Sequence, residues 1–586
     1  MKMNRALHPI LSIVWCTLIP LFAGNAYAQV IRPVVTIQDS YNEKYAVFTD
    51  RSMYIAGEKL HFAVFNLSEK ELASTYRSKV YYMELTKSDG TFIAGAKFPL
   101  SSKGAEGDFH IPENIATGFY FLRSYTRWMR NFSPADFACN RIKIINPNLQ
   151  EIDNPVSDTS DHSNVFIPED TSADIPVPVG CKTDKTTYGT REKVVVSIEI
   201  PSFLKNVSER FCITVTRPGA VDTNKADRVR IDEATEGNSY ALHYIPEAQG
   251  LSLSGKILFK DNSEAAGNVF VQLAVLGGIG DYLSYTTGPD GKFYFSLLPV
   301  TGQQDLFITA RNATDDQLEI HIDKDFANHY NALYPGLFSL HEEERDLAVE
   351  MMINSQVNKA FAEKIDPAIS PSGQDSTGRC FYGKPLKIVI VDEYVALPTL
   401  GEVFFELVSE VNIGKRKDIP YLILTGNVKI NAALASYSPL ILLDRVPVSN
   451  LKDLLEVPPG KIQRIELLNE LYVKGNVIYG GIVSIFSKKG DLAGINLPRN
   501  SFFFDYSGYY PQDSVEFKKY TDLSGDKRIP DFRNCLYWNP EIYIKAGDKA
   551  SLEFYTSDNR GDFEVVVRGM TSMGKVLEKR CRFTVK

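Results

Sequence analysis

The chain has 586 residues, of which 44% are hydrophobic and 23% charged, and its formal net charge at pH 7 is −8. This length exceeds what one hydrophobic core can organise, so we expect about four to six domains. The mild acidity offers no electrostatic footprint for nucleic acid or anionic lipid. No apolar run after Phe22 is long enough to span a bilayer. The sequence therefore predicts a multidomain protein without a nucleic-acid partner and without a transmembrane segment of its own.

Residues 1–28 predict a secretory signal peptide. An apolar run over residues 11–22 follows two basic residues, and Ala26-Tyr27-Ala28 supplies the small-residue cleavage signature. Cleavage after Ala28 removes Lys2 and Arg5 and changes the formal net charge from −8 to −10, because this segment has no acidic residue. We therefore expect export through the Sec route and a periplasmic or outer-membrane-associated location.

Residues 29–146 have the pattern of a β-sandwich, with short strands separated by turns. Within them, Thr49-Asp50-Arg51-Ser-Met-Tyr54 recurs 134 positions later as Thr183-Asp184-Lys185-Thr-Thr-Tyr188. We expect each aspartate to cap a turn and each tyrosine ring to pack beneath it. The repeat predicts a second sandwich over residues 175–245, and the Asp-, Ser- and Pro-rich residues 147–174 predict a linker.

The repeated motif resembles the opening of macroglobulin domains in alpha-2-macroglobulin and complement-like proteins. The first copy, with Gly57 after the tyrosine, matches more closely than the second, which has Arg191 at that position. The resemblance implies two macroglobulin-like sandwiches. It also raises the internal thioester with which that family traps proteases, which needs a Gly-Cys-Gly-Glu-Gln run. Here Gly180-Cys181 continues with Lys182-Thr183, so we expect no thioester and no covalent trapping.

Residues 246–325 predict a third sandwich. Alternating apolar residues predict strands at 253–257 and 269–273, and Pro289-Asp290-Gly291 between alternating runs predicts a β-hairpin. The unit resembles the carboxypeptidase-regulatory, transthyretin-like sandwich, which is structural in most proteins that contain it.

Residues 326–380 predict a helix and a linker. The helix is expected from Ser339 to Ile365, with a capping box formed by Ser339 and Glu342 and an apolar face that ends before Pro367.

Residues 381–492 predict an α/β unit. A helix should start at Thr399 and a helical turn at Asn450, because both side chains can cap. Three short apolar runs, each closed by a turn or a charged pair, then predict strands: Tyr437–Val448, Ile462–Leu468 and Tyr479–Lys489. Their order, strand, helix, strand and hairpin, resembles the plug domain of TonB-dependent outer-membrane receptors. Arg445 departs from that pattern, which has glycine there, so a turn with positive φ is less easily made.

Residues 493–586 predict a final, immunoglobulin-like sandwich. We expect Trp538 to anchor its core rather than to stack on a sugar. Because the residues after Lys489 have a sandwich pattern and not that of barrel strands, we expect a plug-like unit without a pore.

The cysteines do not signal a zinc or redox site. None forms a C-x-x-C pair, so we expect buried single thiols with room for one disulfide. Those after the predicted signal peptide are Cys139, Cys181, Cys212, Cys380, Cys535 and Cys581.

Other acidic and histidine clusters also lack the spacing of a site. Arg345 occupies the second ligand position of a metalloprotease helix that would begin at His341, so helix capping better explains the acids between them. Asp522, Asp526 and Asp531 around Gly525 do not have calcium-loop spacing, and Asp392 and Glu393 have no partner acid for glycosidase chemistry. No nucleophile elbow, phosphate-binding loop or dinucleotide fingerprint occurs.

The sequence thus predicts a mainly β protein, with tandem macroglobulin-like and immunoglobulin-like β-sandwich domains and one inserted plug-like α/β domain. We expect no enzyme activity, no catalytic, cofactor-binding or metal site, and no cofactor. The combination resembles large secreted proteins of the Bacteroidetes type. That resemblance implies a non-catalytic periplasmic scaffold or binding protein, whose partner is an outer-membrane barrel or its accessory proteins, such as a TonB-dependent transport system. Two alternatives stay open: a surface-exposed adhesin or protease-binding protein, and a hydrolase with an unfamiliar site.

Overall fold

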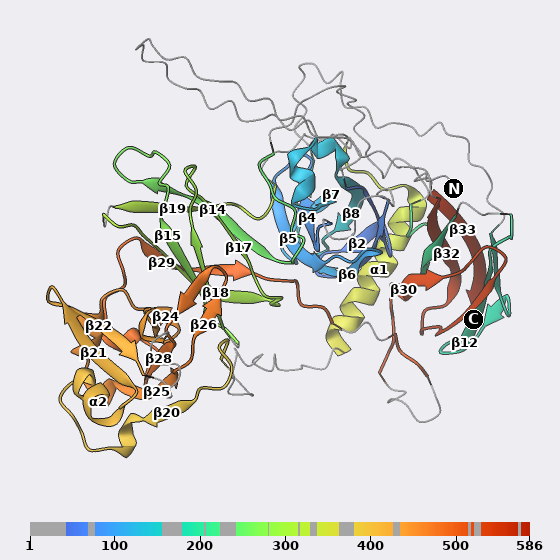
Figure 1. Cartoon of the computed structure of the whole chain (residues 1–586). Helices are drawn as coiled ribbons and strands as arrows, with labels where there is room; N and C mark the ends of the chain where they lie inside the picture. Colours follow the sequence, from blue (N-terminus) through green and yellow to red (C-terminus); the bar gives the residue numbers. More distant parts are fainter. Residues whose placement is uncertain are drawn as a thin grey trace, which may run out of the picture.

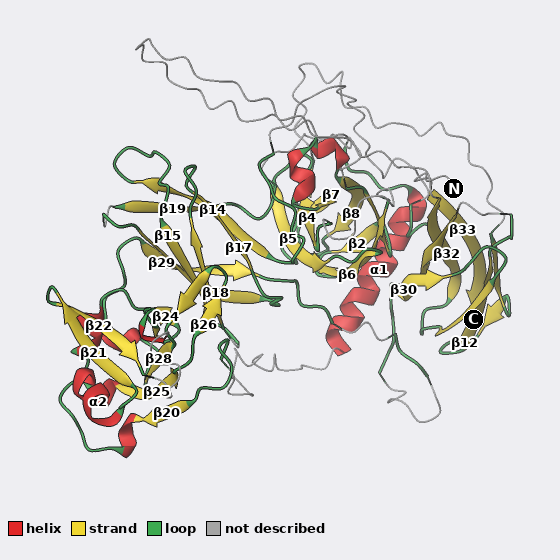
Figure 2. Cartoon of the chain, in the orientation of Figure 1, coloured by secondary structure: helices red, strands yellow, loops and turns green. Residues whose placement is uncertain are grey.

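The computed structural model describes residues 43–67, 77–154, 179–203, 207–222, 242–278, 280–314, 317–327, 337–361, 380–425, 434–513, 517–520, 529–571 and 576–586. Within them the protein is mainly β, which confirms the predicted fold class (Figures 1 and 2). No helix in these ranges is long and apolar enough to cross a membrane. The predicted signal peptide and residues 155–174 of the predicted linker lie outside them.

The first sandwich packs the sheet β1-β3-β6 against the larger sheet β2-β8-β7-β4-β5, to which β9 adds beside β7. Strands β1 and β3 bury both faces: Val47 and Phe62 point into the sandwich core, whereas Phe48 and Phe65 point toward the second sandwich. The elements are β1 (Tyr45–Thr49), β2 (Met53–Ile55), β3 (Lys59–Asn66), β4 (Val80–Thr86), β5 (Phe92–Pro99), β6 (Gly104–His110), β7 (Thr117–Tyr125), η2 (Trp128–Asn131), η3 (Pro134–Asp136), β8 (Ala138–Ile145) and β9 (Ile152–Asp153).

The repeated motif forms the same hydrogen-bonded corner twice, as predicted. The Tyr54 hydroxyl donates to Asp50 Oδ1 at 2.8 Å, and His61 N donates to the same oxygen at 3.0 Å. In the second copy, the Tyr188 hydroxyl and Val195 N both donate to Asp184 Oδ1, at 2.7 and 2.8 Å. In each copy the strand with the tyrosine pairs in parallel with a later strand of its sandwich: β2 with β8, and β11 (Thr187–Tyr188) with β33 (Val576–Val585).

The second sandwich combines two segments that are far apart in the sequence, so the prediction of separate sandwiches over residues 175–245 and 493–586 is wrong. Its sheets, β10-β12-β31 and β11-β33-β32-β13-β30, each contain strands from both segments. Neither segment can bury its apolar face without the other. A disulfide between Cys181 and Cys581 also links the two sheets. The strands are β10 (Gly180–Thr183), β11 (Thr187–Tyr188), β12 (Lys193–Glu199), β13 (Val207–Thr216), β30 (Cys535–Tyr543), β31 (Lys549–Tyr555), β32 (Gly561–Thr571) and β33 (Val576–Val585).

Trp538 is buried, but not in the core of its own sandwich, which corrects the prediction. It packs with Phe48, Phe65 and Met570 in the apolar layer between the first and second sandwiches. Both faces of its strand, β30, are buried: one in the sandwich core and one against the first sandwich. The expectation that Trp538 is buried therefore did not specify which of the two faces it occupies.

The third sandwich packs β17-β14-β19 against β16-β15-β18-β29. Strand β29 comes from the segment predicted to open the C-terminal domain, but it pairs with β18. The turn at Pro289-Asp290-Gly291 forms, yet the strands on either side belong to different sheets, so it is not the predicted hairpin. The strands are β14 (Ser252–Phe259), β15 (Phe270–Val275), β16 (Asp281–Thr286), β17 (Lys292–Ser296), β18 (Gln303–Arg311), β19 (Leu318–Ile322) and β29 (Ser501–Ser507).

Helix α1 (Glu342–Phe361) lies between the first and second sandwiches (Figure 1). Its apolar face packs on Met53 and Ile55 of the first sandwich. Glu344 Oε2 accepts a hydrogen bond from His341 N at 3.0 Å, so the helix starts after His341 and not at the predicted capping box of Ser339 and Glu342. Residues 362–365 of the predicted helix lie outside the described ranges.

The α/β unit forms a compact core around the sheet β20-β25-β28-β23-β24. The predicted caps are present: Thr399 Oγ1 accepts from Glu402 N at 3.3 Å, and Asn450 Oδ1 accepts from Lys452 N at 3.1 Å. The elements are β20 (Lys387–Ile390), η5 (Val391–Glu393), α2 (Leu400–Leu407), β21 (Val411–Arg416), β22 (Ile419–Leu424), β23 (Leu440–Leu443), β24 (Val446–Pro447), α4 (Leu451–Leu455), η6 (Pro459–Lys461), β25 (Ile462–Leu468), β26 (Tyr472–Lys474), β27 (Val477–Tyr479), β28 (Ile482–Ser487) and η7 (Leu492–Gly494).

Arg445 fixes the α/β unit to the third sandwich. The turn between β23 and β24 places Asp444 at φ 49° and Arg445 at φ 70°, which costs about 1 kcal/mol or more at each non-glycine residue. The Arg445 guanidinium donates to the carbonyls of Leu276 and Gly278, at 2.5 and 2.9 Å. These contacts offset the strain, and glycine at this position could not make them.

A buried polar cluster joins the first and third sandwiches. Lys97 Nζ lies 2.6 Å from Asp325 Oδ2 and donates to the carbonyl of Ser507 at 2.7 Å. Glu247, which is fully buried, accepts hydrogen bonds from the Tyr82 and Ser252 hydroxyls at 3.0 and 2.6 Å. Because these groups come from both domains, their burial fixes one relative orientation of the two sandwiches.

We predict that the Cys181–Cys581 disulfide holds the two segments of the second sandwich together. The double variant Cys181→Ala/Cys581→Ala should lose about 2–5 kcal/mol of unfolding free energy. Reductant should lower the unfolding midpoint of the wild type but not of this variant, and peptide mapping without reduction should recover the linked pair. Recovery of another cysteine pair, or a wild type insensitive to reductant, would contradict the prediction.

Glu247 should make stability depend on pH. Burial raises its pKa to about 6, above the ordinary 4.5, so the folded protein holds this proton more tightly than the unfolded chain. The resulting stabilisation of about 2 kcal/mol is complete below pH 4.5 and disappears as pH rises through 6. Urea unfolding at a series of pH values should show this loss in the wild type and not in Glu247→Gln. Parallel pH profiles for the two proteins would refute it.

Candidate functional site

Several residues whose types could support chemistry have structural roles. Cys181 is in the disulfide. His341 directly precedes helix α1, and its backbone N donates to Glu344 Oε2 in the first turn of that helix. Asp531 forms an ion pair with Arg533 at 3.0 Å, while Asp522 and Asp526 lie outside the described residues. Asp392 forms an ion pair with Lys488 at 2.8 Å. In the part of the chain that the structure describes, no three His, Cys, Asp or Glu side chains are grouped to hold a metal ion.

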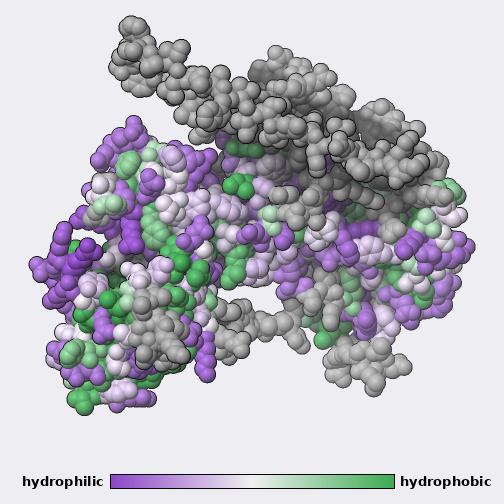
Figure 3. Space-filling view, viewed as in Figure 1, coloured by the Kyte–Doolittle hydropathy of each residue, from purple (hydrophilic) through white to green (hydrophobic). Residues whose placement is uncertain are grey.

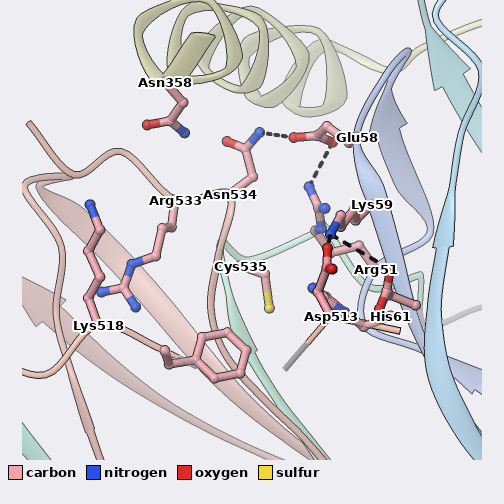
Figure 4. Close-up of a pocket in the computed structure, with 12 residues that line it drawn as sticks. Arg51, Glu58, Lys59, His61, Asn358, Asp513, Lys518, Arg533, Asn534 and Cys535 are labelled. Carbon is pink, nitrogen blue, oxygen red and sulfur yellow. Dashed lines mark hydrogen bonds and ion pairs between the residues drawn. The ribbon is translucent and has the colours of Figure 1, made fainter. Parts of the chain in front are cut away.

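A cavity of about 370 Å³ lies where the first sandwich, helix α1 and the segment leading to β30 meet (Figure 4). No sequence motif indicates a site here, because the lining residues come from five separate stretches of the chain. Most are charged or polar: Arg51, Glu58, Lys59, His61, Asp108, Asn358, Asp513, Phe517, Lys518, Arg533, Asn534 and Cys535.

Arg51 and Glu58 are fixed by the repeated motif of the first sandwich. The Arg51 guanidinium lies 3.0 Å from Asp50 Oδ2 and 3.1 Å from Glu58 Oε2. Burial opposes ionisation of Asp50, but Arg51 and His61 outweigh it and hold the pKa of that carboxyl below its usual range. Glu58 Oε1 accepts a hydrogen bond from the Asn534 amide at 2.5 Å. The motif therefore fixes the segment leading to β30 as well as its own turn.

The wall formed by β3 and β6 contains acidic and basic groups together. Lys59 pairs with Asp513, and its Nζ lies 3.9 Å from Asp108 Oδ2. His61 and Asp108 are directly opposite each other across the two strands. Asp108 Oδ1 and His61 Nδ1 are buried and have no hydrogen-bond partner among the described residues. Burial raises the pKa of Asp108, and Lys59 and His61 oppose that rise.

The facing wall is basic. Figure 4 shows Lys518 and Arg533 across the cavity from Lys59, His61 and Asp513. The Arg533 guanidinium donates to the carbonyls of Leu536 and Tyr555 and pairs with Asp531, so its position is fixed. Lys518 Nζ is 3.9 Å from Asp531 Oδ1, and half of the lysine side chain is exposed.

Cys535 brings a thiol into the same cavity as a histidine and an aspartate, but it is not prepared as a nucleophile. Burial, with a smaller effect of Asp50, raises the pKa of its thiol to about 12. Its Sγ lies 3.4 Å from the carbonyl of Tyr537, to which the thiol donates. The electrostatics here favour binding over covalent chemistry.

A second candidate is an exposed apolar surface on the α/β unit. Figure 3 shows hydrophobic residues gathered over this unit. Leu386 and Ile388, beside and within β20, are 56% and 53% exposed, and Val395 and Phe405 are 86% and 79% exposed. Strand β20 is at the edge of its sheet and pairs only with β25 among the described strands. An exposed edge with apolar side chains is a feature that proteins usually avoid unless another chain covers it.

Comparisons with known proteins give only distant structural similarity. No protein-family model matches the chain, and no curated protein matches its sequence. Salmonella alpha-2-macroglobulin reacted with methylamine is 10% identical, with a TM-score of 0.22 over 93% of this chain and 39% of its own. Escherichia coli alpha-2-macroglobulin activated by porcine elastase is 9% identical, with a TM-score of 0.22 over 93% and 44%. Dimeric latent PorU from Porphyromonas gingivalis is 10% identical, with a TM-score of 0.14 over 48% and 34%. The chain thus spans less than half the length of each of these proteins.

The raised pKa of Cys535 predicts a slow thiol. At pH 8 its thiolate fraction should be about a thousandfold below that of a thiol with the ordinary pKa of 9.0. Mass spectrometry of the folded protein treated with iodoacetamide should therefore find little label on this residue. The same protein unfolded in urea is the control and should be labelled readily. Rapid labelling of Cys535 in the folded protein would show that it is activated after all.

Proposed function

We propose that this protein is a non-catalytic, exported binding protein that attaches to an outer-membrane protein assembly through its α/β unit. The exposed apolar side chains of Leu386, Ile388, Val395 and Phe405 carry the proposal, together with the edge of β20 that no described strand pairs with. A partner that adds a strand to this edge would satisfy its backbone groups and cover its apolar side chains together. The resemblance of the α/β unit to receptor plug domains supports an outer-membrane barrel or one of its accessory proteins as the partner, such as a component of a TonB-dependent transport system.

Two features support export and a scaffolding role. Disulfides persist in oxidising compartments outside the cytosol, and the predicted signal peptide agrees with such a location. The three sandwiches and α1 are joined by buried polar and apolar contacts, which suits a rigid spacer between a membrane assembly and other molecules.

The test is capture of the partner by a surface variant and a matched control. The variant Ile388→Ser/Val395→Ser/Phe405→Ser should keep its unfolding free energy within about 1 kcal/mol, because these side chains are mostly exposed. When a tagged copy of this variant is purified from solubilised outer membranes, the amount of partner recovered with it should be about tenfold or more below that recovered with the wild type. The control Phe203→Ser/Leu298→Ser changes exposed apolar residues on two sandwiches and should retain the partner.

A cross-linker placed at position 388 should link the chain to the captured protein and identify it. Equal capture by the variant and the control would remove the α/β unit from the proposal. Digestion of the protein by protease added to intact cells would instead place it on the cell surface and favour the adhesin or protease-binding alternative.

A further inference from the structure

The β21–β22 hairpin of the α/β unit has apolar side chains on both of its faces. On the inner face, Val411, Leu422 and Leu424 are buried in the core of the unit. Successive side chains of a strand point to opposite faces, so Ile419 and Tyr421 lie on the outer face, where they are 70% and 43% exposed. The exposed face of an antiparallel sheet is usually polar. These two exposed apolar side chains therefore need a physical explanation.

The strand register places both side chains beside a cation or over a glycine. Tyr421 is opposite Gly414, and a Cβ atom at position 414 would lie 2.4 Å from Tyr421 Cζ. The tyrosine ring thus covers the outer surface of the neighbouring strand. Ile419 is opposite Arg416. The outer face consequently presents apolar surface and positive charge side by side.

The turn between the two strands concentrates positive charge. Lys415, Arg416 and Lys417 are exposed, and their side chains have no ion pair or hydrogen bond with other described residues. Asp418 is the one acidic residue between positions 411 and 424, so three cations and one carboxylate leave the hairpin with a net charge of +2. The formal net charge of −8 for the whole chain, which predicts no affinity for anionic lipid, therefore conceals a local basic surface.

The turn itself is strained. Lys417 and Asp418 have φ values of 50° and 61°. A two-residue turn of this kind favours asparagine and glycine, because few other residues adopt positive φ without cost. Lysine at the first position makes the turn less favourable but adds a third cation to its tip. Strain retained at an exposed turn points to a function there.

The hairpin is open to contact from outside the molecule. Its two strands pair only with each other among the described strands. Figure 1 shows the hairpin at the outer margin of the α/β unit, on the side away from helix α1 and the second sandwich. A flat surface can therefore approach the tip without first meeting either of them.

An anionic lipid bilayer matches these features better than a protein does. Recognition of a carboxylate on a protein usually uses a guanidinium whose position is fixed by other bonds, whereas the Arg416 side chain makes none with other described residues. A layer of anionic headgroups requires no fixed geometry, because each lysine or arginine near it is attracted independently. The boundary between headgroups and acyl chains accommodates isoleucine and tyrosine side chains.

We propose that the β21–β22 hairpin binds the surface of an anionic lipid bilayer. Lys415, Arg416 and Lys417 contact the headgroup phosphates. Ile419 and Tyr421 enter the boundary between the headgroups and the acyl chains. Charge attraction or shallow insertion alone gives weak, reversible binding, and the two together hold a protein on a membrane more firmly. This inference is independent of the edge of β20 and needs no protein partner.

Vesicle flotation tests this proposal with the full-length mature chain. The probes are vesicles of phosphatidylcholine alone and of phosphatidylcholine with phosphatidylglycerol at about three to one. The wild type should bind the anionic vesicles about tenfold or more tighter than the neutral ones, which corresponds to about 1.4 kcal/mol. Raising the ionic strength from about 0.1 M to about 1 M should weaken this binding, because the Debye length falls from about 10 Å to about 3 Å.

A charge variant and a matched control locate the attraction. Lys415→Gln/Lys417→Gln should bind the anionic vesicles about tenfold or more weakly than the wild type. The control Lys256→Gln/Lys292→Gln removes two exposed cations that lie opposite each other in the third sandwich, and it should bind as the wild type does. Equal losses in both variants would mean that the attraction is not located at the hairpin.

An apolar variant tests insertion separately. Ile419→Ser/Tyr421→Ser leaves the charge unchanged and should also bind about tenfold or more weakly. Its control, Leu298→Ser/Tyr285→Ser, changes an exposed aliphatic and an exposed tyrosine side chain of the third sandwich and should bind normally. If the double variant at the hairpin does not fold, Ile419→Ser alone, at a mostly exposed side chain, should still bind severalfold more weakly.

Three results would overturn the proposal. The first is a wild type that floats with neither kind of vesicle, and recovery of an acidic protein instead would assign the hairpin to a protein partner. The second is equal loss of binding in the lysine variant and its control. The third is binding by the folded Ile419 variants that equals that of the wild type, which would leave headgroup attraction without insertion.

Discussion

The pairing of strands from residues 180–216 with strands from residues 535–585 is the constraint on which the rest of the molecule depends. Strand β12 pairs with β31, and β13 lies between β30 and β32, so neither segment has a complete sheet without the other. The chain between these two segments is therefore an insertion whose two ends are held together by the second sandwich. Within this insertion, the pairing of β18 with β29 holds the two ends of a second insertion together. In the sequence, the α/β unit is thus inserted into the third sandwich, and the third sandwich is inserted into the second.

Nested closure explains why polar groups are buried at the joints. A sandwich whose two ends are fixed still has freedom to rotate against its neighbours, and apolar contact alone specifies orientation poorly. The contacts of Lys97 with Asp325, and of Arg445 with the carbonyls of Leu276 and Gly278, are directional. Such groups gain little net stability, because leaving water costs nearly as much as the contact returns. Their effect is to make alternative orientations of the domains unfavourable.

The sequence was informative where interactions are local. The Asp50 and Asp184 corners and the caps at Thr399 and Asn450 all follow from residues within about a dozen positions. Pairing over hundreds of residues has no local signal, which is why the second and last sandwiches were predicted as separate domains. The turn at Pro289-Asp290-Gly291 shows the same limit, since turn residues specify a chain reversal and not the partner of the strand that follows. The cavity could not be predicted, because Asp108, Lys518 and Cys535 meet only after the second sandwich closes.

The cavity also shows why composition alone does not define a site. A cysteine, a histidine and an aspartate line one space, which by residue type suggests nucleophilic chemistry. The surroundings of Cys535 decide against it: burial dominates, and the nearby Asp50 carboxylate further disfavours a thiolate. The Arg51 guanidinium opposes this, but it is already shared between Asp50 and Glu58. The same ion pairs that build the repeated-motif corner therefore use the positive charge that an activated thiol would need.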